Sequence, residues 1–319
     1  MAMKEKSKTF TLENYSDEKF GDLLGFYEGK GRGEGGLSEK EARWWRVKLG
    51  RPQYNPGENL FLLSDAKCVI AFLDLVNESR IGRVVMHCQV RPGYLFADAA
   101  TELLIPCLER CAEWKGELIH ICLNESDHAA QRFFRASGFT RVRTFLELNM
   151  DLKENSESEG DPEPGRYSFF CSGEEERLQK LQNEIFKRNW GFCPNTVEEI
   201  EYYLALTGIS VEDILLLKEG DEVIGYCWAH ESPESGCTMR SARIYMLGVL
   251  ERFRGKGLGR KLLGLSLAVL KSLGFRTVEL TVDAENAPAC SLYARLGFRV
   301  RSRSLWFEKT LSVSGSKKI

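Results

Sequence analysis

One sequence pattern occurs twice in this chain at a constant separation, and this repeat limits the folds that the chain can form. An aromatic-rich run ends in Gly-Phe at Gly138 and again at Gly297, 159 positions later. The same separation places Val249 on Val90. A single Gly-Phe match is common by chance, but a register shared over the length of a domain is not. The sequence therefore predicts an internal duplication of one domain.

The two copies are separated by residues 153–165, an acidic stretch rich in Pro, Gly and Ser. Such a composition is typical of a solvated linker. The expected organisation is a first domain over residues 1–152, the linker, and a second domain over residues 166–319. A chain of 319 residues with 43% hydrophobic residues holds enough apolar material for two cores.

Composition argues against several classes of function. The formal net charge is −2, so the chain has no overall attraction to nucleic acid or to an anionic membrane. It has no apolar run of about 18 residues and no signal-peptide pattern at its N-terminus, so a cytoplasmic protein is expected. The ten cysteines form no Cys-x-x-Cys pair, and the four histidines lack metal-ligand spacing. Free thiols and the absence of a metal are therefore expected.

The second copy has the clearest secondary-structure signals. Apolar residues that recur every three or four positions before Gly274 predict a helix, and alternating apolar residues predict strands. The expected elements are a hairpin over 214–228, a strand over 244–249, a helix over 258–273, a strand over 278–282 and a short helix over 286–296. This order predicts an α/β fold with a mixed sheet covered by helices.

A glycine-rich basic loop joins the strand over 244–249 to the helix after it. Gly255, Gly257 and Gly259 allow the backbone to approach a ligand closely, and the N-terminus of the helix favours phosphate. Five basic residues and one acidic residue over 251–261 give a local charge of +4. The spacing matches neither the P-loop nor the dinucleotide-binding fingerprint. Taken alone, the loop is equally compatible with a surface turn.

Two blocks of the second copy resemble the GNAT superfamily of N-acetyltransferases. The first is Arg254-Gly-Lys-Gly-Leu-Gly259, with Val249 five residues before the arginine. The second, at the family's distance downstream, runs from Asn286 through Tyr293 to the second Gly-Phe pair. The resemblance implies two tandem GNAT-type acyl-CoA N-acyltransferase domains. A tandem pair with a degenerate first copy also resembles the mycothiol synthase family in architecture.

The resemblance implies acetyl-CoA as co-substrate and a role for each matching position. The pyrophosphate would bind the amides of the loop, and the pantetheine arm would lie beside the strand before it like an added strand. Tyr293 matches the tyrosine that protonates the departing thiolate. An amine acceptor would attack the thioester directly. The implied co-substrate-binding residues are Leu247, Gly248, Val249, Arg254, Gly255, Lys256, Gly257, Leu258, Gly259 and Asn286.

Several roles stay open in the sequence. Tyr293 lies on an apolar helix face, so it is also compatible with a purely structural place in the core. The general base has no signature; His230, Glu231 and Glu234 are candidates, and each is also compatible with a solvated surface position. Residues 189–196 either line an acceptor pocket or mark a helix break with core aromatics.

A small-molecule primary amine is the expected acceptor. The alternatives are a protein or peptide amine, and a regulatory protein that binds CoA without turnover. Mycothiol synthases have a glutamate where Arg243 stands and a lysine where His230 stands. The resemblance to that family therefore concerns the architecture and not the substrate. The oligomeric state has no signature.

The first copy lacks the features of the second. At the positions 159 residues before two of the loop glycines, the first copy has Phe96 and Asp98. The corresponding window, residues 92–102, has a local charge of −2. A carboxylate repels a pyrophosphate. Phe134 stands in place of the tyrosine, and Asp127 in place of the asparagine. The first domain is therefore expected to be non-catalytic.

Overall fold

The computed structural model describes residues 10–28, 39–152, 165–207, 213–232 and 240–311. The linker expected over 153–165 lies outside the described residues except for its last position. The chain divides into two compact units. None of the described helices is long and apolar enough to cross a membrane.

The two units are not the contiguous segments 1–152 and 166–319. The first comprises residues 1–142 and 305–319, and the second comprises residues 143–304. Most of β6 (Thr140–Asp151) thus belongs to the second unit, and the end of β12 (Arg299–Thr310) belongs to the first. Sequence patterns cannot reveal this, because the alternation of a strand shows which face is buried but not which sheet it joins.

The first unit is a mixed sheet with helices on both faces. Its strand order is β1-β2-β3-β4-β5-β12, antiparallel from β1 to β4 and parallel between β4 and β5. Two clusters of buried apolar residues fill this unit. Its further strands and helices are β1 (Thr11–Asn14), β2 (Leu60–Ser64), β3 (Val69–Glu78), β4 (Arg83–Val90), β5 (Leu118–Asn124), α1 (Phe20–Glu28), α2 (Glu39–Leu49), α3 (Pro56–Asn59), α4 (Phe96–Glu113) and α5 (His128–Ala136).

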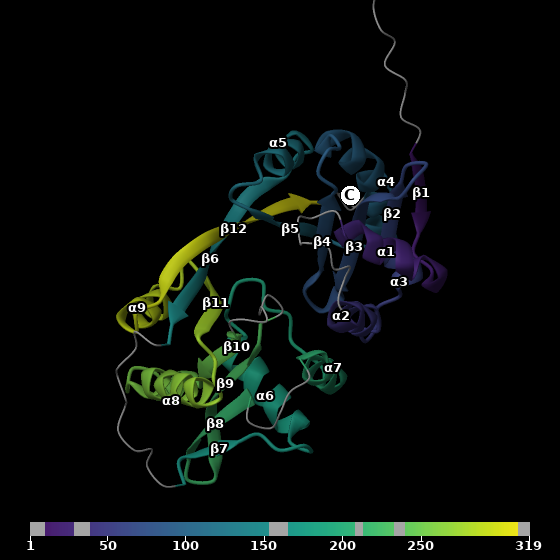
Figure 1. Cartoon of the computed structure of the whole chain (residues 1–319). Helices are drawn as coiled ribbons and strands as arrows, with labels where there is room; N and C mark the ends of the chain where they lie inside the picture. Colours follow the sequence, from purple (N-terminus) through teal and green to yellow (C-terminus); the bar gives the residue numbers. More distant parts are fainter. Residues whose placement is uncertain (1–9, 29–38, 153–164, 208–212, 233–239, 312–319) are drawn as a thin grey trace, which may run out of the picture. The chain divides into compact units, whose positions relative to one another are not determined.

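The second unit repeats this plan around one apolar core. Its strand order is β6-β11-β10-β9-β8-β7, with the start of β12 beside β6. Helix α8 covers one face of the sheet, whereas α6 and α7 lie on the other (Figure 1). The elements are β7 (Tyr167–Phe169), β8 (Ile214–Glu219), β9 (Glu222–Glu231), β10 (Ser241–Val249), β11 (Thr277–Asp283), α6 (Glu175–Phe186), α7 (Val197–Thr207), α8 (Leu258–Ser272) and α9 (Ala287–Arg295).

Helix α8 follows directly from its sequence. Its apolar stripe buries Leu258, Leu262 and Leu270 against the sheet, and each fully buried leucine contributes about 1.5–3 kcal/mol. The helix ends just before Gly274, which has a φ of +84° that glycine adopts without strain. The predicted helix is confirmed, as is the α/β fold with a mixed sheet.

The duplication is visible in the bounds of the elements. β5, α5 and β6 each begin and end 159 residues before β11, α9 and β12. Val90 and Val249 also end equivalent strands, β4 and β10. The register read from the sequence therefore holds over the second half of each copy.

Candidate active site

In the second unit, β10 separates from β11 part-way along its length. The parallel register between these strands ends at Ile244↔Leu280, whereas the register of β10 with β9 continues to Val249↔Gly225. A register shift directly after Ile244 marks the point of separation. The last part of β10 is therefore paired on one side only, and a gap opens beside it.

The backbone of β10 presents hydrogen-bonding groups to this gap. The N–H of Leu250 donates to the carbonyl of Ile224 at 2.8 Å, and in an antiparallel pair alternate residues face the partner strand. Leu247 and Val249 are out of phase with Leu250, so their N–H and C=O groups point away from β9. The main chain of these two residues lines the gap.

Gly248 is required by the packing of α6 on this strand. A Cβ at Gly248 would lie 2.4 Å from Cγ2 of Ile185 and 3.2 Å from the ring of Phe186. Both residues lie in the last turn of α6. The absence of a side chain therefore allows α6 to sit against the edge of the gap.

The basic loop leaves a run of backbone amides without partners. Gly255 and Gly257 have φ values of +79° and +75°, and Gly257 directly precedes α8 without a side-chain cap. Within the described part of the chain, no backbone N–H from Gly255 to Gly259 has a protein acceptor. Unsatisfied amides at a helix N-terminus form a site for anions.

Arg254 holds the loop in place from within the protein. Its guanidinium donates to the carbonyl oxygens of Val249 and Ile185, both at 2.9 Å. Its backbone N–H donates to Glu251 at 3.1 Å. The side chain thus ties the loop to the ends of β10 and α6, and the ligand-binding groups of the loop are the amides that follow it.

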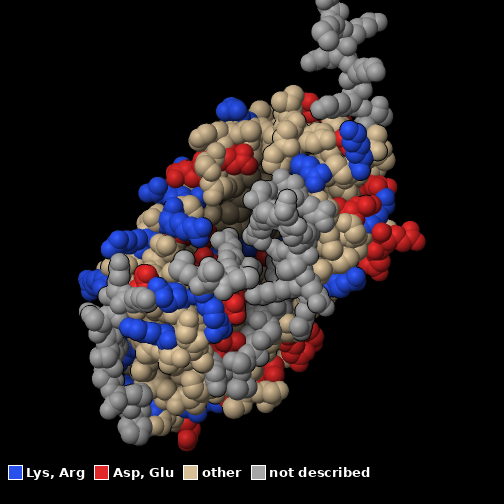
Figure 2. All heavy atoms as spheres, in the orientation of Figure 1, with Lys and Arg blue, Asp and Glu red and all other residues tan. Residues whose placement is uncertain are grey.

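Part of the charge counted in the sequence is paired with residues outside the loop. Arg252 forms an ion pair with Glu222, and Glu251 pairs with Arg188 at 2.5 Å. The ammonium of Lys256 lies 5.4 Å from the ring centroid of Phe253. Basic side chains are numerous over α8 and α9 on the face shown in Figure 2. The surroundings of the loop therefore stay favourable to an anion.

Tyr293 occupies the core and still has an unused hydroxyl. It is 8% exposed and packs against the ring of Phe298 at 5.6 Å. Among the described residues no group forms a hydrogen bond with its hydroxyl. Burial raises the pKa of Tyr293 well above its usual value. The phenol is therefore protonated and available as a proton donor, which is compatible with both predicted roles.

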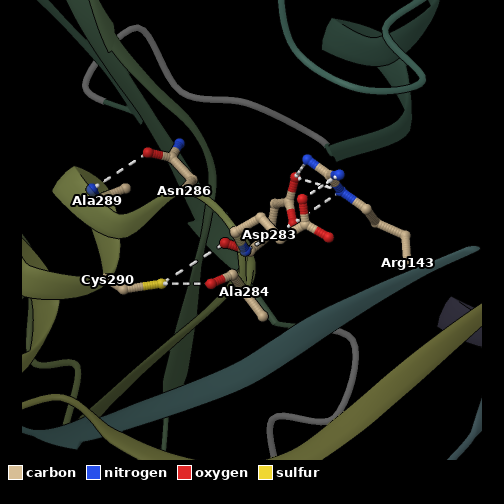
Figure 3. A network of polar contacts seen from close by, with 7 residues as sticks. Arg143, Asp283, Ala284, Asn286, Ala289 and Cys290 are labelled. Atoms are coloured by element: carbon tan, nitrogen blue, oxygen red, sulfur yellow. Dashed lines mark hydrogen bonds and ion pairs between the residues drawn. The ribbon is translucent and has the colours of Figure 1, made fainter.

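Asn286 begins helix α9. Its Oδ1 accepts a hydrogen bond from the N–H of Ala289 at 3.3 Å, the geometry of an N-cap. The turn before it is held by Arg143 of β6, whose guanidinium lies 2.9 Å from Asp283 (Figure 3). The structure thus gives Asn286 a capping role, and its contact with a co-substrate stays a prediction.

These features agree with a known family. Residues 176–298 match the model of the acetyltransferase (GNAT) family. This part of the chain, which lies within the second unit, belongs to the GNAT acetyltransferase family. It is an acyltransferase enzyme, and the predicted family is confirmed.

Similar proteins align with more of the chain than residues 176–298. The mycothiol acetyltransferase of Actinosynnema mirum is 28% identical over 230 residues, which cover 72% of this chain and 75% of that protein. The mycothiol acetyltransferase of Segniliparus rotundus is 25% identical over 261 residues, or 81% of this chain and 97% of that protein.

Solved structures show the same GNAT fold over nearly the whole chain. A GCN5-related N-acetyltransferase from Sphaerobacter thermophilus has a TM-score of 0.69 at 22% identity and covers 94% of this chain and 95% of its own. A tandem GNAT protein from the clavulanic acid biosynthesis pathway has a TM-score of 0.69 at 15% identity and covers 97% of this chain and 100% of its own. The tandem GNAT architecture is thus confirmed.

The first GNAT unit keeps the gap but not the loop. Its β4–β5 register ends at Met86↔Ile121, whereas β4 stays paired with β3 as far as Val90. In the loop, the ring of Phe96 packs edge-on against that of Phe134 at 6.0 Å. Aromatic rings thus pack at the positions where the second unit has a glycine and Tyr293.

One of the two alternatives for residues 189–196, a helix break, is present in the structure. They join α6 to α7, which is the predicted helix break. The ring of Trp190 lies 6.0 Å from that of Phe145 and 5.8 Å from the guanidinium of Arg143. Trp190 therefore packs beside β6, and whether this segment contacts an acceptor stays a prediction.

The three candidates for the general base have different surroundings. His230 is 8% exposed, whereas Glu231 is exposed and lies 3.4 Å from Arg240. Glu234 lies outside the described residues. The sequence analysis did not single out Glu147 and Glu279, which flank Arg243 in the same sheet. The alternation of charged and apolar residues in both strands was the signal for them.

Proposed function

We propose that this GNAT enzyme transfers an acetyl group from acetyl-CoA to a primary amine of a small molecule, within a ternary complex in the second unit. The observation that carries the proposal is the run of amides from Gly255 to Gly259, at the start of α8, that have no acceptor among the residues that the structure describes. Five consecutive donors at the positive end of a helix dipole match the diphosphate of CoA.

The gap beside β10 supports the position of the thioester. The N–H and C=O groups of Leu247 and the N–H of Val249 face the gap and can pair with the amides of a pantetheine arm, as an added strand would. The carbonyl of Val249 accepts a hydrogen bond from Arg254. The N–H of Leu247 is the donor that we assign to the oxyanion of the tetrahedral intermediate. One such donor is worth about 10²–10³ in kcat.

Tyr293 is the proposed general acid for the CoA leaving group. Burial is the main cause of the raised pKa of Tyr293, and Cys227, the register partner of Leu247, is near enough to act in the same direction. This proximity supports a position of the phenol near the thioester sulfur. As the C–S bond breaks, the phenol protonates the CoA thiolate and then regains a proton from solvent.

The acceptor is proposed from the relatives and from the charged residues on the sheet. Two relatives are mycothiol acetyltransferases, named for a small-molecule substrate. Arg243 lies in the sheet between Glu279 at 3.2 Å and Glu147 at 3.5 Å. A polar small molecule fits such a charged sheet face better than an apolar one does. The first unit, with Phe96 and Asp98 in its loop, is proposed to bind no CoA.

Calorimetric titration with CoA tests the loop directly. Gly257→Ala introduces a side chain at a φ of +75°, which costs about 1 kcal/mol or more and displaces the amides. The variant is expected to bind CoA at least tenfold more weakly. The matched control is Gly93→Ala in the first unit, where φ is +93° and no atom lies within 4 Å of the added carbon.

The control is expected to leave CoA affinity unchanged. Equal affinities in the wild type and Gly257→Ala would contradict the assignment of the loop. A screen of small amines and peptides that follows free-thiol release then tests the acceptor. Release with peptides alone would replace the small-molecule acceptor with a protein one, and CoA binding without release in any reaction would indicate a protein without turnover.

A further inference from the structure

We propose that His230 is the general base that removes a proton from the acceptor amine. The inference rests on the proposed function and adds a catalytic residue to it. Three lines of observation on the described residues support it: the place of His230 in the sheet, the hydrogen bond that fixes its tautomer, and the charges around its ring.

His230 lies on β9, one strand away from the closed end of the gap. It is the register partner of Arg243, which is in turn paired with Glu279, so the three residues form one row across β9, β10 and β11. The strands β10 and β11 separate one position beyond this row. The ring of Tyr245, at the register shift, lies 6.1 Å from that of His230. We place the acceptor amine at this closed end of the gap, one position beyond the row that contains His230.

The two ring nitrogens of His230 differ in their hydrogen bonding. Nδ1 lies 2.9 Å from the carbonyl oxygen of Glu231. A carbonyl only accepts hydrogen bonds, so Nδ1 carries the proton and Nε2 carries the lone pair of the neutral ring. Among the described residues, Nε2 has no hydrogen-bond partner. The free lone pair is the feature that a base requires.

The surroundings keep the imidazole neutral. Burial lowers the pKa of His230 below its usual value, and the charge of Arg243 acts in the same direction. The carbonyl of Glu231 and the carboxylate of Glu279 oppose this, but less than burial does. On the side of α7, the ring of Tyr203 lies 5.8 Å from that of Tyr245. Tyr203 is uncharged, so it does not oppose the lowered pKa of His230. The net result favours the unprotonated base at neutral pH.

The proton transfer completes the proposed reaction. A primary ammonium gives one proton to Nε2 of His230, directly or through one water. The resulting amine attacks the thioester carbonyl, the C–N bond forms, and the C–S bond breaks as Tyr293 protonates the thiolate. The nitrogen loses its second proton to solvent as the amide forms. His230 returns its proton to solvent, so the products are the amide and free CoA.

The test is the pH profile of His230→Gln. In the wild type, kcat/KM is expected to fall at acid pH with a midpoint below 6.5, because protonation of His230 removes the base. The glutamine variant keeps a donor for the carbonyl of Glu231 but has no base. Its kcat is expected to fall about 10²–10⁴-fold, its acid limb to disappear, and its affinity for acetyl-CoA to stay unchanged.

Two further variants separate a base from a structural role. His128→Gln changes an exposed histidine of the first unit and is expected to leave rate and profile unchanged. His230→Glu supplies a different base and is expected to recover part of the rate, with the acid limb moved to lower pH.

Either of two results would overturn the proposal: an acid limb that persists in a folded His230→Gln protein, or a glutamate variant as slow as the glutamine one. A wild type that binds CoA but acetylates no amine would overturn the proposed function, and the proposed base with it.

Discussion

At the scale of single residues, Tyr293 shows that a place in the core and a chemical role are compatible. Its ring packs on Phe298, so the side chain contributes to stability through burial. Its hydroxyl forms no hydrogen bond with any residue that the structure describes, so that group contributes little to the fold. The two properties can be separated by removal of one oxygen atom.

Tyr293→Phe is expected to keep the fold and lose turnover. The ring stays in place, so the free energy of unfolding should change by less than about 1 kcal/mol. The general acid is lost, so kcat should fall about 10²–10⁴-fold with little change in acetyl-CoA affinity. Steady-state kinetics and calorimetry on the same preparation measure both. Unchanged turnover would remove the general-acid role.

Residue types in the sequence predict some of the roles in the site but not all of them. The loop glycines were predictable, because a left-handed backbone before a helix requires glycine at Gly257. The partner of Arg254 was not, because the carbonyl of Ile185 is distant in sequence and carbonyls carry no sequence signal. The capping role of Asn286 could have been predicted, because Pro288 follows it in the first turn of the helix.

At the scale of elements, the contact between α6 and β10 positions the edge of the proposed thioester site. Gly248 is the point of closest approach, since an added Cβ would meet Ile185 at 2.4 Å. Arg254 binds the carbonyl of the same Ile185. One residue of α6 therefore sets the position of both the strand and the loop.

Gly248→Ala is expected to push α6 away from β10. The required shift costs about 1–3 kcal/mol, which thermal or denaturant unfolding would detect. The affinity for acetyl-CoA should fall as well, since the strand and the loop share this contact. Gly264→Ala, in the middle of α8, is a comparison in which helix propensity favours the alanine. Equal stability of the Gly248→Ala protein and the wild type would contradict the close packing.

At the scale of the whole molecule, each compact unit includes a strand that lies outside its own contiguous copy. The second unit needs residues 143–152, which precede the linker, for the strand beside β11. Leu148, Met150 and Leu152 of this segment are buried in its core. The repeat predicted the number of units and the order of their elements, but strand exchange depends on long-range pairing that local patterns do not encode.

The fragment 166–319 is therefore expected not to fold cooperatively. It lacks three buried side chains worth about 1.5–3 kcal/mol each, against a total stability of about 5–15 kcal/mol for a domain. The fragment 143–304 keeps them and is expected to unfold in one transition. Circular dichroism during thermal unfolding compares the two. A cooperative transition at the same temperature for both fragments would contradict the division into units.

The exchanged strands also bear on the history of the chain. After an ordinary duplication, a copy that has lost its chemistry can be shed without harm to the other. Here a deletion of residues 1–152 would also remove β6 and leave β11 with an unpaired edge. Loss of the first copy is therefore expected to damage the second as well, because the second unit depends on β6.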